Sequence, residues 1–160
     1  MFDRLINEAR LPRAEAPSSG GIEGGRIAAR PGAGQKAEAR EVIEAHGALL
    51  TPALVEPHIH LDAVLTVGQP RHNQSGSLFE GIAIWGERVK SLTVDDVKQR
   101  VSEVLRWQLA NGVLFTRSHV DVCDPNLTAL RALLALRQEV EDRIHLQLGA
   151  SPPQVIPAFP

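Results

Sequence analysis

The order of apolar segments between residues 49 and 148 is the feature that most constrains the fold. Residues 49–55 form a nearly continuous apolar run, which is typical of a strand buried on both faces. Two helical patterns follow it, and then come a strand pattern that begins at 113, a third helical pattern and an alternating strand pattern over 144–148. Strands that alternate with helices in this order form a parallel sheet with right-handed crossovers. We therefore predict an α/β fold for this part of the chain.

Capping patterns predict where the helices begin and end. Ser77, with a glutamate three residues later, forms a capping box and predicts a helix from there to about Lys90. Thr93 precedes the second helix, and Gly112 follows it as a stop signal. Asp124, with a proline directly after it, is the predicted N-cap of the third helix. Apolar residues recur at helical spacing within the second and third helices, which supports these boundaries.

Residues 1–48 are organised differently, because turn-forming residues divide them into short segments. These segments are predicted to be strands at 4–11, 26–29 and 41–45 and loops at 14–25 and 30–36. Aromatic residues are few, so the core of this part is predicted to be thin. At the other end, four of the chain's 11 prolines lie in the last nine residues, which excludes a helix or a central strand there. The chain is therefore divided into segments 1–48, 49–148 and 149–160.

Charge and composition exclude several functional classes. The 17 basic and 19 acidic residues are interspersed and leave a net charge of −2, so no basic stripe is present for binding nucleic acid or an anionic membrane surface. The apolar runs are shorter than the roughly 20 residues that span a bilayer. The first residues lack the apolar core of a signal peptide, and the single Cys123 cannot form an internal disulfide. We therefore expect a cytoplasmic protein with no nucleic-acid or membrane partner.

The sharpest chemical feature is the tripeptide His58-Ile59-His60 at the end of the first apolar strand. Side chains at positions i and i+2 of a strand share a face and lie roughly 6.5–7 Å apart, so both imidazoles can reach one metal ion. Asp62 returns to the same face, where it can orient a histidine. The spacing alone also fits two histidines in a polar loop. Their position after a buried strand favours an active site, because parallel α/β folds place such sites at the carboxyl ends of strands.

His119 and Asp121 repeat the i, i+2 spacing at the end of the second predicted strand. Either this pair belongs to the same polar edge as the first histidines, or the two side chains bond to each other and position the loop that starts at Cys123. We favour the second interpretation. Cys123 has neither a neighbouring base nor a glycine-framed loop, so no catalytic role is predicted for it.

The segment 54–62, Leu-Val-Glu-Pro-His-Ile-His-Leu-Asp, resembles the amidohydrolase superfamily. Later motifs narrow the resemblance to the bacterial cytosine deaminases. These motifs are Gly-Gln-Pro at 68–70, Asn-Gln-Ser-Gly-Ser-Leu-Phe-Glu-Gly-Ile at 73–82, Asp-Asp-Val-Lys-Gln-Arg at 95–100, Trp-Gln-Leu-Ala-Asn-Gly at 107–112 and His-Val-Asp-Val at 119–122. The resemblance is good over residues 49–148 and weaker, but in register, over residues 4–48.

The resemblance implies a metal-dependent hydrolase built on a (β/α)₈ TIM barrel, with a small β-sandwich that takes strands from both chain ends. His58 and His60 would be metal ligands at the end of the first barrel strand, and the loop that carries Leu78 would lie over a pyrimidine-like substrate. Bound Fe²⁺ or Zn²⁺ would acidify a water that attacks the amidine carbon of cytosine and releases uracil and ammonia. The implied role is in pyrimidine metabolism.

The length of the chain departs from this family. Only 108 of the 160 residues follow Pro52, whereas such a barrel needs about 250. We therefore expect about the first three barrel strands, that is, a partial barrel. The family's remaining metal ligands and its catalytic glutamate belong to later strands, so no catalytic residue is assigned in this chain. Where the family has a substrate-holding glutamine after a proline, this sequence has Pro153, and Gln154 follows one position late.

Three functions remain open. The chain is a cytosine-deaminase-like hydrolase that is truncated and inactive as given, another amidohydrolase that acts on a different cyclic amide or amidine, or a non-catalytic piece, such as half of a split enzyme. An incomplete barrel leaves open strand edges, and whichever of the Leu54, Phe115 and Leu146 side chains point into the barrel would face solvent. We therefore expect the chain to form a homo-oligomer or to pair with a complementing chain.

Overall fold

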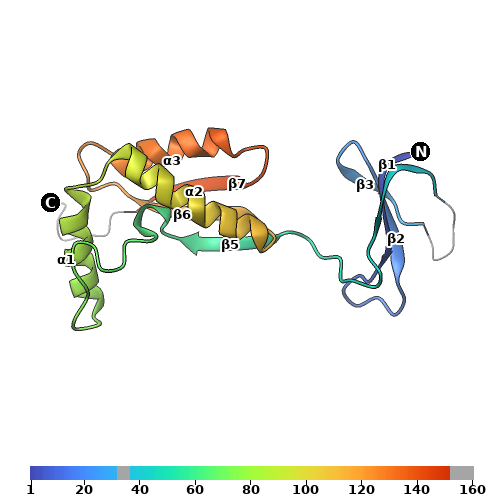
Figure 1. The fold of residues 1–160 in the computed structure, drawn as a ribbon, viewed down its shortest axis with the longest axis horizontal. Helices are drawn as coiled ribbons and strands as arrows, with labels where there is room; N and C mark the ends of the chain where they lie inside the picture. Colours follow the sequence, from blue (N-terminus) through green and yellow to red (C-terminus); the bar gives the residue numbers. More distant parts are fainter. Residues whose placement is uncertain (32–36, 152–160) are drawn as a thin grey trace. The chain divides into compact units, whose positions relative to one another are not determined.

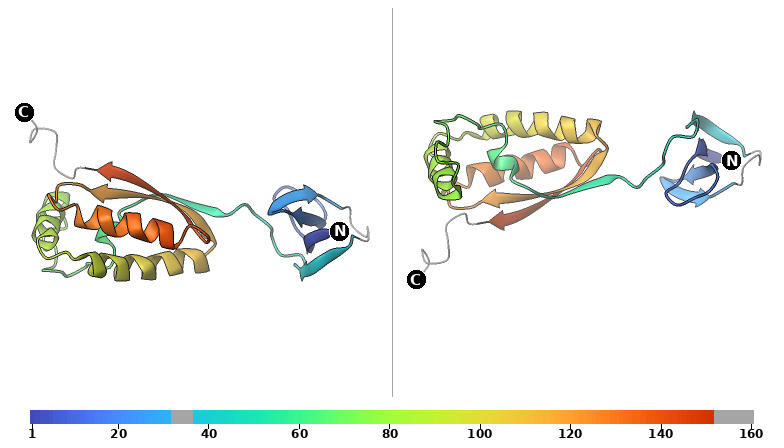
Figure 2. Two further views of the ribbon diagram at one scale, coloured as in Figure 1. Left: turned by 90° about the horizontal axis from the view of Figure 1, so that it is seen from above. Right: turned by 90° about the horizontal axis from the view of Figure 1, so that it is seen from below.

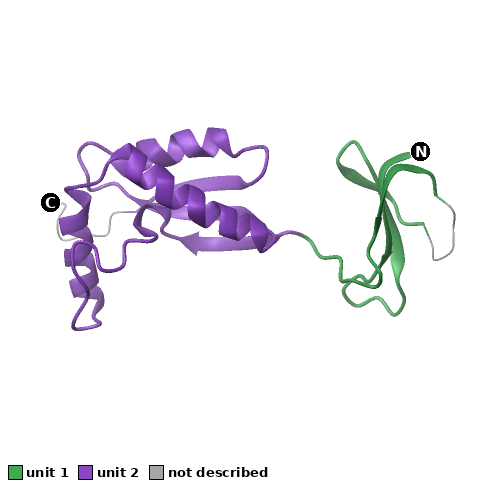
Figure 3. Ribbon diagram, viewed as in Figure 1, with its two compact units in different colours: residues 1–52 green, residues 53–160 purple. Residues whose placement is uncertain are grey.

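The computed structural model describes residues 1–31 and 37–151, which form two compact units, Met1–Pro52 and Ala53–Pro160 (Figure 3). The first unit is a four-stranded sheet in the order β3-β2-β1-β4. Its strands are β1 (Phe2–Ala9), β2 (Ser18–Glu23), β3 (Arg26–Ala29) and β4 (Ala39–Glu44). β1 pairs antiparallel with β2 and parallel with β4. Its apolar core is thin, since Leu5 and Ala9 are its buried hydrophobic residues within the described ranges.

Strand β2 corrects the prediction of a loop over residues 14–25. Gly20 and Gly21 are poor strand formers by themselves, and the sequence pattern therefore indicated a loop. In the sheet they pair with Ile6 and Leu5 of β1, and the ring of Phe2 packs directly over Gly21. A Cβ atom at Gly21 would lie 2.6 Å from that ring. The glycines are therefore accommodated by close packing in the sheet rather than by a turn.

The second unit is an α/β layer, as the sequence predicted. Its sheet is parallel, with the order β5-β6-β7. In chain order, its elements are β5 (Leu54–Ile59), the short 3₁₀ turn η1 (Leu61–Ala63), α1 (Leu78–Val89), α2 (Val94–Ala110), β6 (Val113–Asp121), α3 (Thr128–Glu139) and β7 (His145–Ser151). Helices α2 and α3 cover one face of this sheet, and α1 stands at one end of it (Figures 1 and 2).

The core of this unit lies between the sheet and helices α2 and α3. Val97 and Val101 of α2, Leu133 of α3 and Leu146 of β7 are each at most 3% exposed. The first two helices begin where the capping patterns predicted: the hydroxyl of Ser77 accepts the Glu80 N–H, and that of Thr93 accepts the Asp96 N–H. No helix in residues 1–31 and 37–151 is long and apolar enough to cross a membrane.

Two predictions for this unit are wrong in detail. The strand expected over 49–55 begins only at Leu54, and Leu54 and Val55 are 54% and 62% exposed rather than buried on both faces. β5 is an outer strand of the described sheet, and helices cover only one face of that sheet, so both side chains remain partly in solvent. Of the three side chains considered for the barrel interior, Leu146 belongs to the core beneath the helices, whereas Leu54 and Phe115 are exposed.

The third helix also begins later than predicted. The carboxylate of Asp124 accepts the N–H groups of Asn126 and Thr128, and Leu127 takes a left-handed conformation at φ 51° before α3 starts. An aspartate can bond its own backbone a few residues on in a turn as readily as at a helix N-cap. The Asp-Pro pair therefore marks a turn that leads into the helix, not its first residue.

Candidate metal centre

Three histidine rings gather at the carboxyl edge of the parallel sheet. The ring centroids of His58 and His60 are 5.5 Å apart, and His119 of β6 lies 4.2 Å from His58 and 5.8 Å from His60. Ile59 pairs with Ser118 in the parallel register, which brings the neighbouring residues His60 and His119 side by side. Ile59 itself packs against the core. The sheet therefore turns the two sequence-predicted histidines into a cluster of three.

The spacing of the first two rings fits a shared metal ion. A Zn–N bond of about 2.0–2.1 Å and an N–Zn–N angle of about 90–120° put two imidazole centroids about 4.5–5.5 Å apart. His58 and His60 meet this condition at 5.5 Å. His119 lies closer to His58, at 4.2 Å and with the ring planes tilted by 34°, which is a packing contact between rings. Within the described ranges no group of three or more His, Cys, Asp or Glu side chains could hold a metal ion. The described residues thus bring together two imidazoles at a spacing that one metal ion could bridge.

His119 joins the first two histidines, which is the interpretation that sequence reasoning considered but did not favour. We had favoured a bond between His119 and Asp121, but its ring lies against His58 instead. Burial lowers the pKa of His119, and the nearby His58 and His60 lower it further. The signal was present in the sequence: a second histidine pattern at the carboxyl end of the neighbouring parallel strand.

Asp121 positions the loop at Cys123, although without the predicted bond to His119. Its Oδ1 accepts the Cys123 N–H at 2.7 Å. Its Oδ2 accepts the indole N–H of Trp85 at 2.7 Å, a contact across 36 residues that ties α1 to the end of β6. The aspartate therefore joins a loop, a strand and a helix beside the histidine cluster.

Asp62 lies in η1, two residues after His60, and is 1% exposed. We expected its carboxylate to orient a histidine, but Oδ2 accepts the backbone N–H of Asp121 at 2.7 Å. Burial raises the pKa of Asp62, while the Asp121 N–H and the charge of His60 act in the opposite direction. The carboxylate thus links the turn after β5 to the end of β6.

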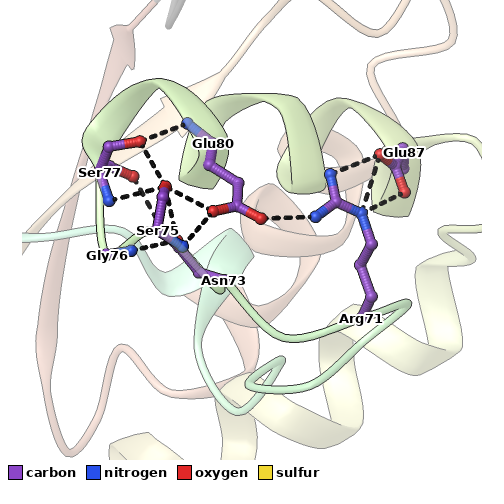
Figure 4. A network of polar contacts seen from close by, with 7 residues as sticks. All are labelled: Arg71, Asn73, Ser75, Gly76, Ser77, Glu80 and Glu87. Atoms are coloured by element: carbon purple, nitrogen blue, oxygen red, sulfur yellow. Dashed lines mark hydrogen bonds and ion pairs between the residues drawn. The ribbon is translucent and has the colours of Figure 1, made fainter.

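Leu78, the predicted substrate contact, begins α1 and is 75% exposed, and its neighbour Phe79 is 78% exposed. The loop before it is braced by Glu80, as Figure 4 shows. Glu80 accepts hydrogen bonds from the Ser75 N–H at 2.7 Å, from the Ser75 hydroxyl at 2.5 Å and from Arg71 at 2.8 Å. These bonds, first those from Ser75, lower the pKa of Glu80 to about 2. Gln154 lies outside the described residues.

Comparison with known proteins identifies similar chains. The sequence profile of the amidohydrolase family matches residues 41–147. A structure of 5-methylcytosine deaminase from Klebsiella pneumoniae, liganded with 5-fluorocytosine, is 44% identical in sequence and superimposes with a TM-score of 0.89. The match covers 96% of this chain and 37% of that chain. N-isopropylammelide isopropylaminohydrolase from Burkholderia multivorans is 30% identical with a TM-score of 0.75, over 95% of this chain and 38% of that one.

A curated relative agrees with these structures. N-isopropylammelide isopropyl amidohydrolase of Pseudomonas sp. (strain ADP) is 29% identical over an alignment of 158 positions that covers 93% of this chain. The present chain spans 38% of the length of that relative.

Proposed function

This chain belongs to the amidohydrolase family, and on that premise we propose that it forms part of a metal-dependent deaminase that acts on a cytosine-like pyrimidine. The observation that carries the proposal is the His58–His60 pair, whose centroid separation of 5.5 Å suits one divalent ion at the carboxyl edge of a parallel sheet. The 44% identity to a 5-methylcytosine deaminase over 96% of the chain supports the substrate class.

His58 and His60 would hold the ion, Fe²⁺ or Zn²⁺, through imidazole nitrogens. Such an ion supplies a Lewis acid and a nucleophilic water near neutral pH. His119 packs against His58 and, with its lowered pKa, is expected to be neutral near pH 7. Leu78 begins α1 directly after the braced loop and would form an apolar cover for the pyrimidine ring. No residue of this chain is assigned the role of general acid or base.

The remaining ligands and the proton-transfer groups would come from further strands. We propose that β5, β6 and β7 are the first three strands of a (β/α)₈ barrel and that the first unit contributes strands to a β-sandwich. The exposure of Leu54, Val55 and Phe115, at 54%, 62% and 47%, is consistent with a sheet that is covered in the complete protein. The whole activity is therefore proposed for this chain together with the remaining strands.

A chimera tests the proposal. Residues 1–151 would replace the corresponding segment of the Klebsiella pneumoniae 5-methylcytosine deaminase, so that the relative supplies the rest of the fold. We expect the purified chimera, loaded with Fe²⁺ or Zn²⁺, to release ammonia from cytosine or 5-methylcytosine. His58→Ala in the same chimera removes one ligand and should abolish that activity, whereas His46→Ala, at a turn of the first unit, should leave it unchanged.

Other outcomes separate the alternatives. A chimera that releases isopropylamine from N-isopropylammelide but no ammonia from cytosine would favour the second substrate class, which the relatives at 29% and 30% identity represent. A folded, metal-loaded chimera that hydrolyses neither compound would contradict a catalytic role for these residues.

A further inference from the structure

Asp62 is a buried carboxylate that is only partly satisfied. Its Oδ2 accepts the Asp121 N–H at 2.7 Å. Its Oδ1 is buried and has no hydrogen-bond partner among the residues that the structure describes. Burying a carboxylate oxygen without a partner is costly, and such a group calls for an explanation beyond the stability of the fold.

The turn that carries Asp62 is clamped from two other sides. The hydroxyl of Ser118, on β6, accepts the Leu61 N–H at 3.1 Å. The guanidinium of Arg100, on α2, donates to the carbonyl oxygens of Asp62 at 3.0 Å and Val64 at 2.6 Å. Ser118 is fully buried and Arg100 is 9% exposed, so water does not compete strongly for these bonds.

Asp62 differs from the other clamp residues in the part of β6 to which it bonds. Ser118 precedes His119 in β6, whereas the N–H that Asp62 accepts belongs to Asp121, beyond His119. The two bonds therefore hold β6 on both sides of His119 against the turn that follows His60.

We propose that Asp62 is a positioning residue for the histidine cluster and that its buried negative charge strengthens divalent-cation binding by His58 and His60. The inference rests on the proposed metal pair. The carboxylate has two roles that can be tested separately. Oδ2 holds the end of β6 through a hydrogen bond, and the negative charge favours a cation nearby. Asparagine keeps an acceptor oxygen and loses the charge, whereas alanine loses both.

The test uses the 160-residue chain and Co²⁺, whose visible absorption reports both affinity and ligand geometry. Asp62→Asn is expected to weaken Co²⁺ binding by about 10-fold, and Asp62→Ala by about 10- to 100-fold, as for other groups that support metal ligands. Asp142→Asn removes an exposed charge outside the clamp and is the control. It should bind Co²⁺ within about twofold of the unsubstituted chain.

Hydrogen–deuterium exchange without metal measures the positioning role. Asp62→Ala should raise exchange over both 58–63 and 119–123, whereas Asp62→Asn should leave these segments protected. An Asp62→Asn chain that binds Co²⁺ as tightly as the unsubstituted one would overturn the charge role. Unchanged exchange in a folded Asp62→Ala chain would overturn the positioning role. If the alanine variant fails to fold, the asparagine variant still decides the charge role. Ser118→Ala, which loses the bond to the Leu61 N–H and should raise exchange over 58–63, then decides the clamp.

One further outcome concerns the proposed function itself. If His58→Ala and His60→Ala leave Co²⁺ binding unchanged, the metal pair is wrong, and the role of Asp62 fails with it. If these two variants lose binding while both Asp62 variants keep it, only the role of Asp62 fails.

Discussion

The indole N–H of Trp85 donates a 2.7 Å hydrogen bond to the carboxylate of Asp121. This bond joins the middle of α1 to the last residue of β6, two residues beyond His119. The same carboxylate accepts the Cys123 N–H, and the backbone N–H of Asp121 is held by Asp62. Helix α1, with Leu78 at its start, is thereby fixed to the edge of the sheet that carries the histidines.

Replacing Trp85 with Phe should loosen α1 while leaving the sheet intact. The variant keeps an aromatic ring and removes one hydrogen bond to a charged group, which contributes about 1.5–3 kcal/mol. We expect exchange of the α1 amides to rise by about 10- to 100-fold, measured by hydrogen–deuterium exchange and mass spectrometry. Trp107→Phe, at a side chain that is 51% exposed, is the matched control and should leave α1 unchanged. Equal protection of α1 in both variants would show that the indole bond does not hold the helix.

Glu80→Gln should release the loop before α1. The ionised carboxylate receives the bonds from Ser75 and Arg71, and Gln accepts them less strongly. We expect trypsin to cleave after Arg71 faster in this variant at pH 8. Glu103→Gln removes an exposed partner of Arg106 on α2 and is the control. Cleavage at Arg71 that is equally fast in the unsubstituted chain would mean that the network does not restrain the loop.

The same network predicts a pH dependence. The pKa of Glu80 is lowered from an ordinary value of 4.5 to about 2, so the folded loop favours the charged form. Its contribution is complete above pH 4.5 and is lost as the pH falls through about 2. The ¹³C shift of the Glu80 carboxyl carbon in labelled protein should titrate near pH 2. A midpoint near 4.5 would contradict the bonding that Figure 4 shows.

The isolated chain should associate through its open sheet. β5 and β7 are the outer strands of the described parallel sheet, and Val55 on β5 is 62% exposed. Unpaired strand edges with apolar side chains promote association. We expect Val55→Lys to shift the chain toward monomer in size-exclusion chromatography with light scattering, while Val67→Lys, in a loop, has no such effect. A monomeric unsubstituted chain would show that this sheet needs no partner.

The purified chain alone should neither deaminate cytosine nor bind Zn²⁺ tightly. Two histidines leave a hydrolytic ion without its remaining ligands, and no general acid or base is assigned here. We expect calorimetry to show weak Zn²⁺ binding, and we expect His58→Ala to reduce the affinity at least about 10-fold. Loss of a residue that only supports a metal ligand already costs about that much, so loss of a ligand itself should cost no less. His46→Ala should change nothing. Ammonia release from cytosine above a metal-only blank would refute the prediction.

Much of the second unit was predictable because its signals are local. The hydroxyls of Ser77 and Thr93 act within three residues, and both helices begin where the patterns indicated. The alternation of strands and helices likewise predicted the parallel sheet. Asp124 failed as an N-cap because the same side-chain bonds stabilise a turn, and the residues nearby do not distinguish the two.

The sequence by itself determined the family, the order of strands and helices, and the pairing of His58 with His60, because each depends on spacing along one segment. Only the tertiary structure decided that His119 joins them and that Asp62 bonds to Asp121 rather than to a histidine. Both depend on the register between β5 and β6, in which Ile59 pairs with Ser118 across 59 positions of the chain. β2 is a strand for the same kind of reason, since Gly21 packs under Phe2 only once the sheet has formed. Contacts between distant segments are set by strand register and core packing, and no pattern within either segment encodes them alone.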